Sequence, residues 1–295
     1  KRWIVCFLLL VFLMPLVHGV TASERKKKDK GELPVAKETK YEKLMKKAGR
    51  ESATGEFLSL HKIEGKLYVE LPLKYCGRDL LIASTTAESS NSMLAMVGYK
   101  MNDPLHVKFV KMDSTIVLQM VNSSMESDEE LGLAIKRNYL NSFYKKYPVV
   151  TYNNDSTSVV FDMTEMFIGD EEALKPVESN YSILGITSRL KPGFGMLNKI
   201  KAFSDNITIE SYMTYDYSIT FFGEELGSGA LTTKLVRTIL LLPEDQMKPR
   251  IADSRIGIFL TGKENITMTK DGIESYALVN RWRLEPKDMK AWERG

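Results

Sequence analysis

Alternating apolar and polar residues recur in short runs along most of the chain. Residues 67–71 alternate and residues 79–85 follow as a more continuous apolar run, so both predict β-strands. Residues 105–111 and 115–121 alternate on either side of a Met-Asp-Ser turn at 112–114, which predicts a hairpin. Runs that predict further strands occupy residues 158–163, 207–214, 217–222, 234–242, 256–260, 265–269 and 276–284.

Helical spacing is confined to three segments. Residues 41–47 and 164–167 predict short helices. A long helix is predicted over residues 127–147, because a Ser-x-x-Glu capping-box pattern opens it and Pro148 ends it. Its apolar residues recur every four positions and are expected to face the core: Leu131, Ile135, Tyr139, Phe143 and Tyr147.

These patterns predict a mainly β, or α+β, fold. We expect antiparallel sheets arranged as a sandwich or a curled sheet, with one long helix and a few short helices. Residues 191–195 (Lys-Pro-Gly-Phe-Gly) are expected to form a loop, and residues 223–229 a turn between two strands.

The N-terminus has the pattern of a secretory signal peptide. Within residues 1–22, a Lys-Arg pair and an apolar run precede small residues at the positions that a signal peptidase recognises. A membrane anchor is the alternative, but it needs about 20 apolar residues and this run is shorter. We therefore expect export to the periplasm, the cell surface or the medium, with no stable membrane span after cleavage.

The rest of the chain divides by composition. Residues 23–40 are rich in Lys, Glu and Gly without an apolar period and predict a flexible linker. A Ser/Asn-rich joint near residue 88 separates a small strand-based module at 41–87 from a β-rich domain at 88–285. Residues 286–295 are expected to begin a connector to a further domain.

Composition and charge limit the classes of partner that are expected. The chain has 295 residues, 43% of them hydrophobic and 27% charged, which is enough for a sizeable core. The formal net charge of +3 comes from the start of the chain: residues 24–51 carry 11 basic against 6 acidic residues, whereas residues 52–295 carry 28 basic against 32 acidic. No aromatic residues are interleaved with the basic run, so nucleic acid is not an expected partner.

Residues that could carry chemistry are few. Cys76 is the one cysteine left after signal-peptide removal, so no intrachain disulfide can form, and its apolar neighbours favour a small buried residue over a reactive thiol. His61 and His106 lie in no metal-ligand spacing, and a surface or interface position is expected for each. The acidic pairs at 171–172 and 224–225 are expected in solvated loops.

One short pattern imitates a catalytic motif. Ser142 and Lys145 fit Ser-x-x-Lys, and Ser-Asp-Asn follows at residues 204–206, as in serine β-lactamases. The Lys-Thr-Gly strand that this mechanism also needs is missing, and Ser142 lies late in the predicted helix. We therefore assign no catalytic, cofactor-binding or metal-binding residue to this chain.

Four motifs near the C-terminal end carry a family resemblance. They are Leu-Pro-Glu-Asp at 242–245, Lys-Pro-Arg at 248–250, Asp-x-Arg-Ile-Gly-Ile-Phe at 253–259 and Arg-Trp-Arg-Leu-Glu at 281–285. Together with residues 41–44, 65–72, 77–81 and 164–169, this pattern resembles the N-terminal, non-catalytic region of large secreted bacterial zinc-dependent metalloproteases, formed by domains of unknown function that precede a His-Glu-x-x-His protease domain. The chain departs from the pattern at Ser254, at Gln246-Met247 and at Cys76.

The resemblance implies an accessory role. It implies that zinc and peptide-bond hydrolysis belong to a catalytic domain downstream of Gly295, and that this chain, without activity alone, serves as a scaffold, a docking surface or a latency element. The implied partners are that catalytic domain and protein or peptide substrates. A narrower hypothesis is that Cys76 caps the zinc as a thiolate. The alternative function is a free-standing secreted β-rich binding or adhesion module.

Overall fold

The computed structural model describes residues 38–295 apart from residues 124, 128, 178–179, 182, 268–271 and 285. The predicted signal peptide and most of the predicted linker lie outside the described residues. The described part is mostly β, with antiparallel sheets and short helices, which confirms the predicted fold class.

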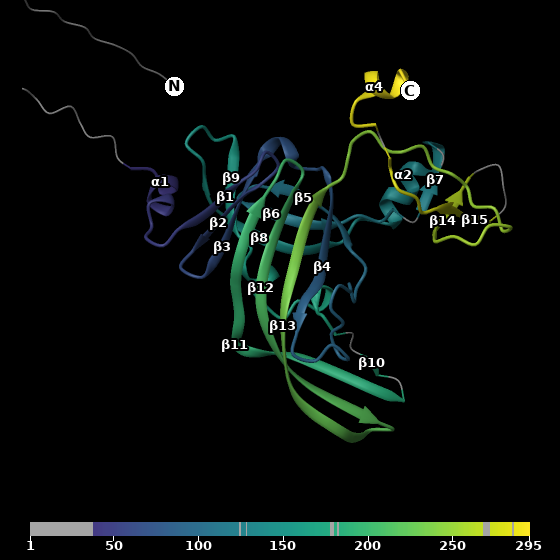
Figure 1. The fold of residues 1–295 in the computed structure, drawn as a ribbon. Coiled ribbons are helices and arrows are strands. Elements are labelled where there is room, and N and C mark those ends of the chain that lie inside the picture. The colour runs from purple at the N-terminus through teal and green to yellow at the C-terminus, as the bar shows by residue number, and fades with distance from the viewer. Residues whose placement is uncertain are drawn as a thin grey trace, which may run out of the picture. The chain divides into compact units, whose positions relative to one another are not determined.

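The elements are numbered along the chain (Figure 1). The strands are β1 (Glu51–Thr54), β2 (Ser59–Ile63), β3 (Lys66–Pro72), β4 (Asp79–Ser89), β5 (Leu105–Met112), β6 (Thr115–Met120), β7 (Met125–Ser127), β8 (Phe143–Tyr152), β9 (Ser158–Asp162), β10 (Asn180–Tyr181), β11 (Leu184–Ala202), β12 (Asn206–Phe221), β13 (Glu224–Leu241), β14 (Leu260–Ile266) and β15 (Ile273–Val279). The helices are α1 (Lys40–Met45), α2 (Glu129–Asn138), α3 (Thr164–Ile168) and α4 (Met289–Glu293), with 3₁₀ turns η1 (Leu73–Tyr75) and η2 (Glu172–Leu174).

Two sheets hold these strands. A 12-stranded sheet has the order β1-β2-β3-β9-β8-β6-β5-β4-β13-β12-β11-β10, and its long strands β4, β13, β12 and β11 lie side by side in Figure 1. A smaller sheet has the order β15-β14-β7, in which β14 pairs antiparallel with β15 and parallel with β7.

The large sheet curls until it nearly closes. Strands β1 and β2, at one end of the strand order, contact β11 near the other end. Across this junction Lys62 Nζ donates to the backbone oxygen of Asn198 at 2.8 Å. Gly55 lies in the same junction, and a Cβ there would overlap the carbonyl oxygens of Phe203 and Leu58. A residue without a side chain is therefore required where the two ends meet.

The core lies inside the curl. Alternate residues of β12 and β13 are buried, as expected when successive side chains of a strand point to opposite faces. The inward residues are Ile207, Ile209, Ser211, Met213 and Tyr215 on β12, and Leu231, Thr233, Leu235, Arg237 and Ile239 on β13. Ile207, Ile209 and Ile239 join one large cluster with residues of β2, β3, β4, β5 and β9, whereas Met213, Tyr215 and Leu235 form a separate cluster. Ser211, Thr233 and Arg237 are the buried polar or charged residues among these positions.

Helix α3 is held against the inner face. It contacts β3, β11 and β12, and Met166 and Phe167 are fully buried. At its start Asp162 Oδ1 accepts from the backbone N–H of Thr164 at 2.9 Å, and Thr164 Oγ1 in turn accepts from Leu67 N at 2.9 Å. These bonds satisfy polar groups that burial would otherwise leave without partners.

The predicted long helix over residues 127–147 is wrong. Helix α2 ends at Asn138, and the aromatic residues that follow form strand β8, which pairs with β6 and β9. A four-residue spacing fits one face of a helix, but it also fits one face of a strand because four is a multiple of two. Strand β8 does not keep both residues on one face, because its pairing with β6 shifts between Phe143 and Lys145, so Phe143 is exposed whereas Tyr147 is buried. The β-forming content of residues 143–150 decides the outcome.

The predicted loop at residues 191–195 and the predicted turn at 223–229 are also wrong. The first lies within β11 as an irregularity in its pairing with β12 between Leu190 and Gly195. The second is shorter than predicted: residues 224–229 belong to β13, and the turn consists of Phe222 and Gly223, both with positive φ (45° and 86°). The predicted strand at 256–260 reduces to the first residue of β14.

Residue 88, the predicted module boundary, falls inside β4. The strands on both sides of it share one sheet and one core: β3 pairs with β9, and β4 pairs with β5 and β13.

Candidate functional site

The motif-bearing C-terminal stretch folds back along the smaller sheet. Ile251 forms a bridge with Leu278 of β15, and the backbone N–H of Val279 donates to Arg250 O at 2.9 Å. Further along, Asn280 N donates to Phe259 O at 2.9 Å. The stretch is therefore fixed beside β15 by backbone hydrogen bonds, although most of it belongs to no strand.

The start of this stretch is joined to β4. Arg78 donates to Leu242 O at 3.0 Å and forms an ion pair with Glu244 at 2.7 Å, while Leu242 N donates to Asp79 O at 2.9 Å. Residues 77–81 and 242–245, which both carry the family resemblance, are thus in direct contact.

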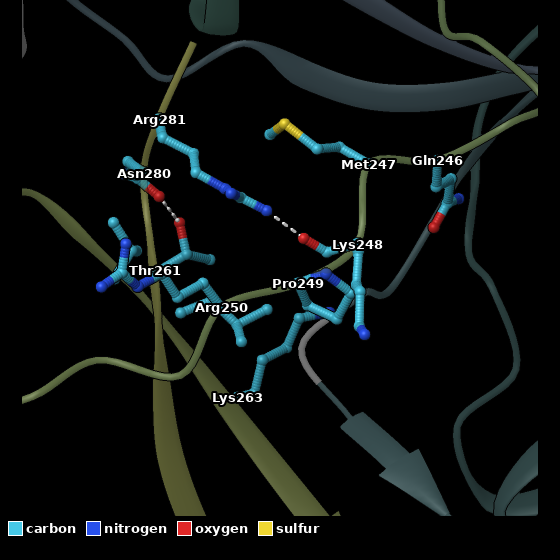
Figure 2. A pocket seen from close by; sticks show the side chains of 11 residues that line it. Gln246, Met247, Lys248, Pro249, Arg250, Thr261, Lys263, Asn280 and Arg281 are labelled. Atoms are coloured by element: carbon cyan, nitrogen blue, oxygen red, sulfur yellow. Dashed lines mark hydrogen bonds between the residues drawn. The ribbon is translucent and has the colours of Figure 1, made fainter. Parts of the chain in front are cut away.

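Eleven residues from three segments line a pocket of about 510 Å³ beside β14 and β15 (Figure 2). We call it the basic pocket. Its lining residues are Gln246, Met247, Lys248, Pro249, Arg250, Thr261, Lys263, Leu278, Val279, Asn280 and Arg281. Four of them are cationic, none is acidic, and several are apolar. The lining can therefore attract an anionic group while contacting an apolar one.

Hydrogen bonds hold the pocket walls together. Figure 2 shows Arg281 reaching across to the carbonyl oxygen of Lys248, and Thr261 Oγ1 donating to Asn280 Oδ1 at 2.7 Å. Lys263 Nζ also donates to Ser123 O, which ties β14 to the segment before β7.

The neighbouring acidic residues have partners outside the pocket. Asp245 pairs with Arg283 at 3.4 Å, and Asp253 accepts hydrogen bonds from Arg255 that lower the pKa of its carboxyl to about 2. Among the described residues, no ion pair forms at Lys248, Arg250 or Arg281.

Large apolar side chains of the same motifs face solvent. The exposed fractions are 87% for Phe259, 89% for Trp282 and 88% for Leu284. Each of the three therefore has apolar area that a partner could cover.

The predicted chemistry-bearing residues are dispersed. His61 on β2 is buried, contrary to the surface position predicted for it, and bonds to Ser52 Oγ at 2.9 Å and Glu70 Oε2 at 3.1 Å. Tyr41 of α1 donates to the same Glu70 oxygen, so His61 belongs to a structural network that docks α1. His106 lies on β5, with β3, β9, β8 and β6 between it and the strand of His61.

Cys76 is half-buried against the main core, and burial raises the pKa of its thiol. The two serines of the β-lactamase-like pattern lie on different segments of the chain. Ser142 is exposed just before β8, and Ser204 is exposed in the turn between β11 and β12.

A buried polar layer inside the curl was not predicted. Arg237 is fully buried, and its Nη1 donates to Phe167 O at the end of α3 and to Ser211 Oγ at 2.7 Å. Ser211 Oγ also donates to Phe167 O at 3.2 Å. Arg237 lies two residues from both Leu235 and Ile239 on β13, so it points to the same face of the strand as they do. This alternation was the one signal in the sequence that could have shown Arg237 to face inward.

Glu171 is likewise buried, whereas the sequence predicted a solvated loop. It accepts a hydrogen bond from Tyr144 Oη and forms an ion pair with Lys145. Burial, followed by this hydrogen bond, raises the pKa of Tyr144 well above its usual range. Of the acidic pair at 171–172, only the first residue therefore faces inward, and the second is exposed.

The described residues contain no group of three or more His, Cys, Asp or Glu side chains arranged to hold a metal ion. Among the same residues, no helix has the length and apolar character needed to cross a bilayer.

The fold and the pocket define a mainly β protein built on one curled antiparallel sheet, with a basic pocket beside a second, smaller sheet. The chain belongs to the family of the domain of unknown function DUF5117, whose model matches residues 98–287 and so includes both the basic pocket and Arg237. No curated protein and no solved structure matches the chain.

Proposed function

We propose that this chain is the exported N-terminal accessory region of a zinc-dependent metalloprotease, in which a downstream domain hydrolyses the peptide bond. In this proposal the catalytic zinc and its ligands belong to that domain. The chain itself acts as a scaffold and docking surface for it, and presents protein or peptide substrates to it.

The exposure of Phe259, Trp282 and Leu284 carries the proposal. These side chains belong to the motifs that lead toward the connector, and each is more than four-fifths exposed. Burying a side chain of this size contributes about 1.5–3 kcal/mol. In this proposal, the domain that follows Gly295 covers them.

The contact between residues 77–81 and 242–245 gives further support. Both stretches carry the family resemblance, and Arg78 and Asp79 connect them through side-chain and backbone bonds. This explains on structural grounds why the two distant motifs would occur together. Cys76 is half-buried against the main core, so we propose docking rather than a Cys76 zinc cap.

Reading the source gene beyond Gly295 tests the proposal directly. A His-Glu-x-x-His motif is expected within the next few hundred codons. A stop codon soon after Gly295 would refute it and favour a free-standing binding or adhesion module.

Docking is tested with the downstream domain produced separately. We expect that domain to co-purify with the present chain, and the variant Trp282→Ser/Leu284→Ser to lose the association. Phe222→Asn is the matched control, since Phe222 is an exposed aromatic residue in the β12–β13 turn whose positive φ asparagine tolerates. Equal loss with the control would contradict docking through Trp282 and Leu284.

A further inference from the structure

The geometry points to the basic pocket as a binding site for a carboxylate-bearing peptide segment. This inference does not depend on a downstream protease, because it follows from the charges and shape of the pocket alone.

The basic pocket holds several positive charges without a negative one. Lys248, Arg250 and Arg281 line one cavity without an acidic lining residue, and within the described part of the chain none of them forms an ion pair. Like charges held together repel one another, and an anion in the pocket relieves that repulsion. The nearby carboxylates do not serve this purpose, because Asp245 and Asp253 pair with Arg283 and Arg255.

Positioning is the second argument. Arg281 donates one of its five N–H groups to Lys248 O, so its other N–H groups can donate to other acceptors. Arg250 is held by the bond from Val279 N to its carbonyl oxygen, so its backbone is fixed at the pocket wall. Arginine side chains on a fixed backbone match the two oxygens of a carboxylate.

The apolar lining selects the kind of ligand. Met247, Pro249, Leu278 and Val279 line the pocket together with the cations, so an acidic residue next to an apolar one can satisfy both. Nucleic acid is less well matched. Its phosphates need an extended positive surface, whereas residues 52–295 carry 28 basic against 32 acidic residues and the cations gather at one cavity.

Fluorescence anisotropy with a dye-labelled Gly/Ser peptide carrying a central Glu-Leu-Glu tests the inference on the full chain. The matched probe replaces both glutamates with glutamine. We expect the glutamate probe to bind about tenfold or more tightly than the glutamine probe, with an affinity that falls as sodium chloride is raised.

Matched variants locate the site. Lys248→Gln/Arg250→Gln should weaken binding of the glutamate probe by about tenfold or more, and Arg250→Lys should have an intermediate effect. The control Lys199→Gln/Lys201→Gln removes the same charge from exposed lysines of β11 and should leave the affinity within about twofold. Far-ultraviolet circular dichroism checks that each variant is folded.

Several results would overturn the inference. These are equal affinity for the glutamate and glutamine probes, absence of binding to either, and an equal effect of the β11 control. Tighter binding of a thymidine oligonucleotide that competes with the glutamate probe would assign the pocket to phosphates instead.

Discussion

Arg237 offers the sharpest test of the fold, because a fully buried cation both stabilises and destabilises its surroundings. Its Nη1 donates to Phe167 O and to Ser211 Oγ, while Nε and Nη2 have no hydrogen-bond partner in the described structure. Burial also lowers the pKa of Arg237, which reflects the unfavourable desolvation of its charge. The two substitutions Arg237→Met and Arg237→Ala separate these effects.

The expected magnitudes differ between the two variants. Either substitution loses the hydrogen bonds of the charged Nη1 to Phe167 O and to Ser211 Oγ, about 1.5–3 kcal/mol each. Either also removes the desolvation penalty of the charge, which amounts to several kcal/mol. Phe167 O keeps the bond from Ser211 Oγ, so it is not left without a partner. For methionine, which fills most of the space, we expect a net loss below about 1.5 kcal/mol.

Alanine leaves a cavity in addition. Large-to-small core substitutions lose about 2–5 kcal/mol, so Arg237→Ala should destabilise the protein by about 3–5 kcal/mol. Urea unfolding followed by circular dichroism measures both values, with Lys201→Met on the exposed face of β11 as a control expected within about 0.5 kcal/mol. If Arg237→Met is as destabilising as Arg237→Ala, the hydrogen bonds to α3 dominate and the reasoning is refuted.

Three further predictions concern other parts of the fold. Gly55→Ala should lower the free energy of unfolding by about 1–3 kcal/mol, because the added Cβ would overlap backbone oxygens. Gly257 has open space around it, so Gly257→Ala should change this free energy little, and thermal unfolding of the two variants compares them. Glu171→Ala should destabilise by about 2–3 kcal/mol because Tyr144 and Lys145 lose their buried partner; urea unfolding checks this, and no change would contradict the burial of Glu171. Arg255 lowers the pKa of Asp253 to about 2. The stability that this pair contributes is therefore fully present above the ordinary carboxyl pKa and is lost as the pH falls through about 2. An NMR titration of Asp253 should show a higher midpoint in Arg255→Gln than in the wild type.

Sequence patterns predicted the strands whose inner and outer faces differ in polarity. The runs at 67–71 and 105–111 became β3 and β5, in which alternate residues are buried against the core. The runs at 115–121 and 158–163 became β6 and β9, in which successive residues are buried. Strand β11 gave no such signal, since Pro192, Gly193 and Gly195 interrupt its pattern and its pairing with β12 shifts there. Its backbone is stabilised by a neighbouring strand, which local sequence does not reveal.

The sites were harder to predict for a related reason. The basic pocket combines segments 246–250, 261–263 and 278–281, and the sequence assigned no binding residue to any of them. The motifs at 248–250 and 281–285 overlap two of these segments, but their sequence does not show that they meet β14. Arg237 and Glu171 were missed because charged side chains are expected at the surface, and only tertiary structure supplies their buried partners.

The junction that closes the curled sheet also affects the order of folding. Lys62 and Asn198 are separated by 136 residues, so β1 and β2 have no partner at this junction until β11 has been made. At about 5–20 residues per second, ribosomal synthesis of the intervening chain takes roughly 7–30 s. During that interval Leu58 and Leu60, both fully buried in the final fold, lack part of the core that covers them. Contacts this distant in sequence also slow folding itself. The nascent chain therefore needs protection from aggregation until its second half has been synthesised.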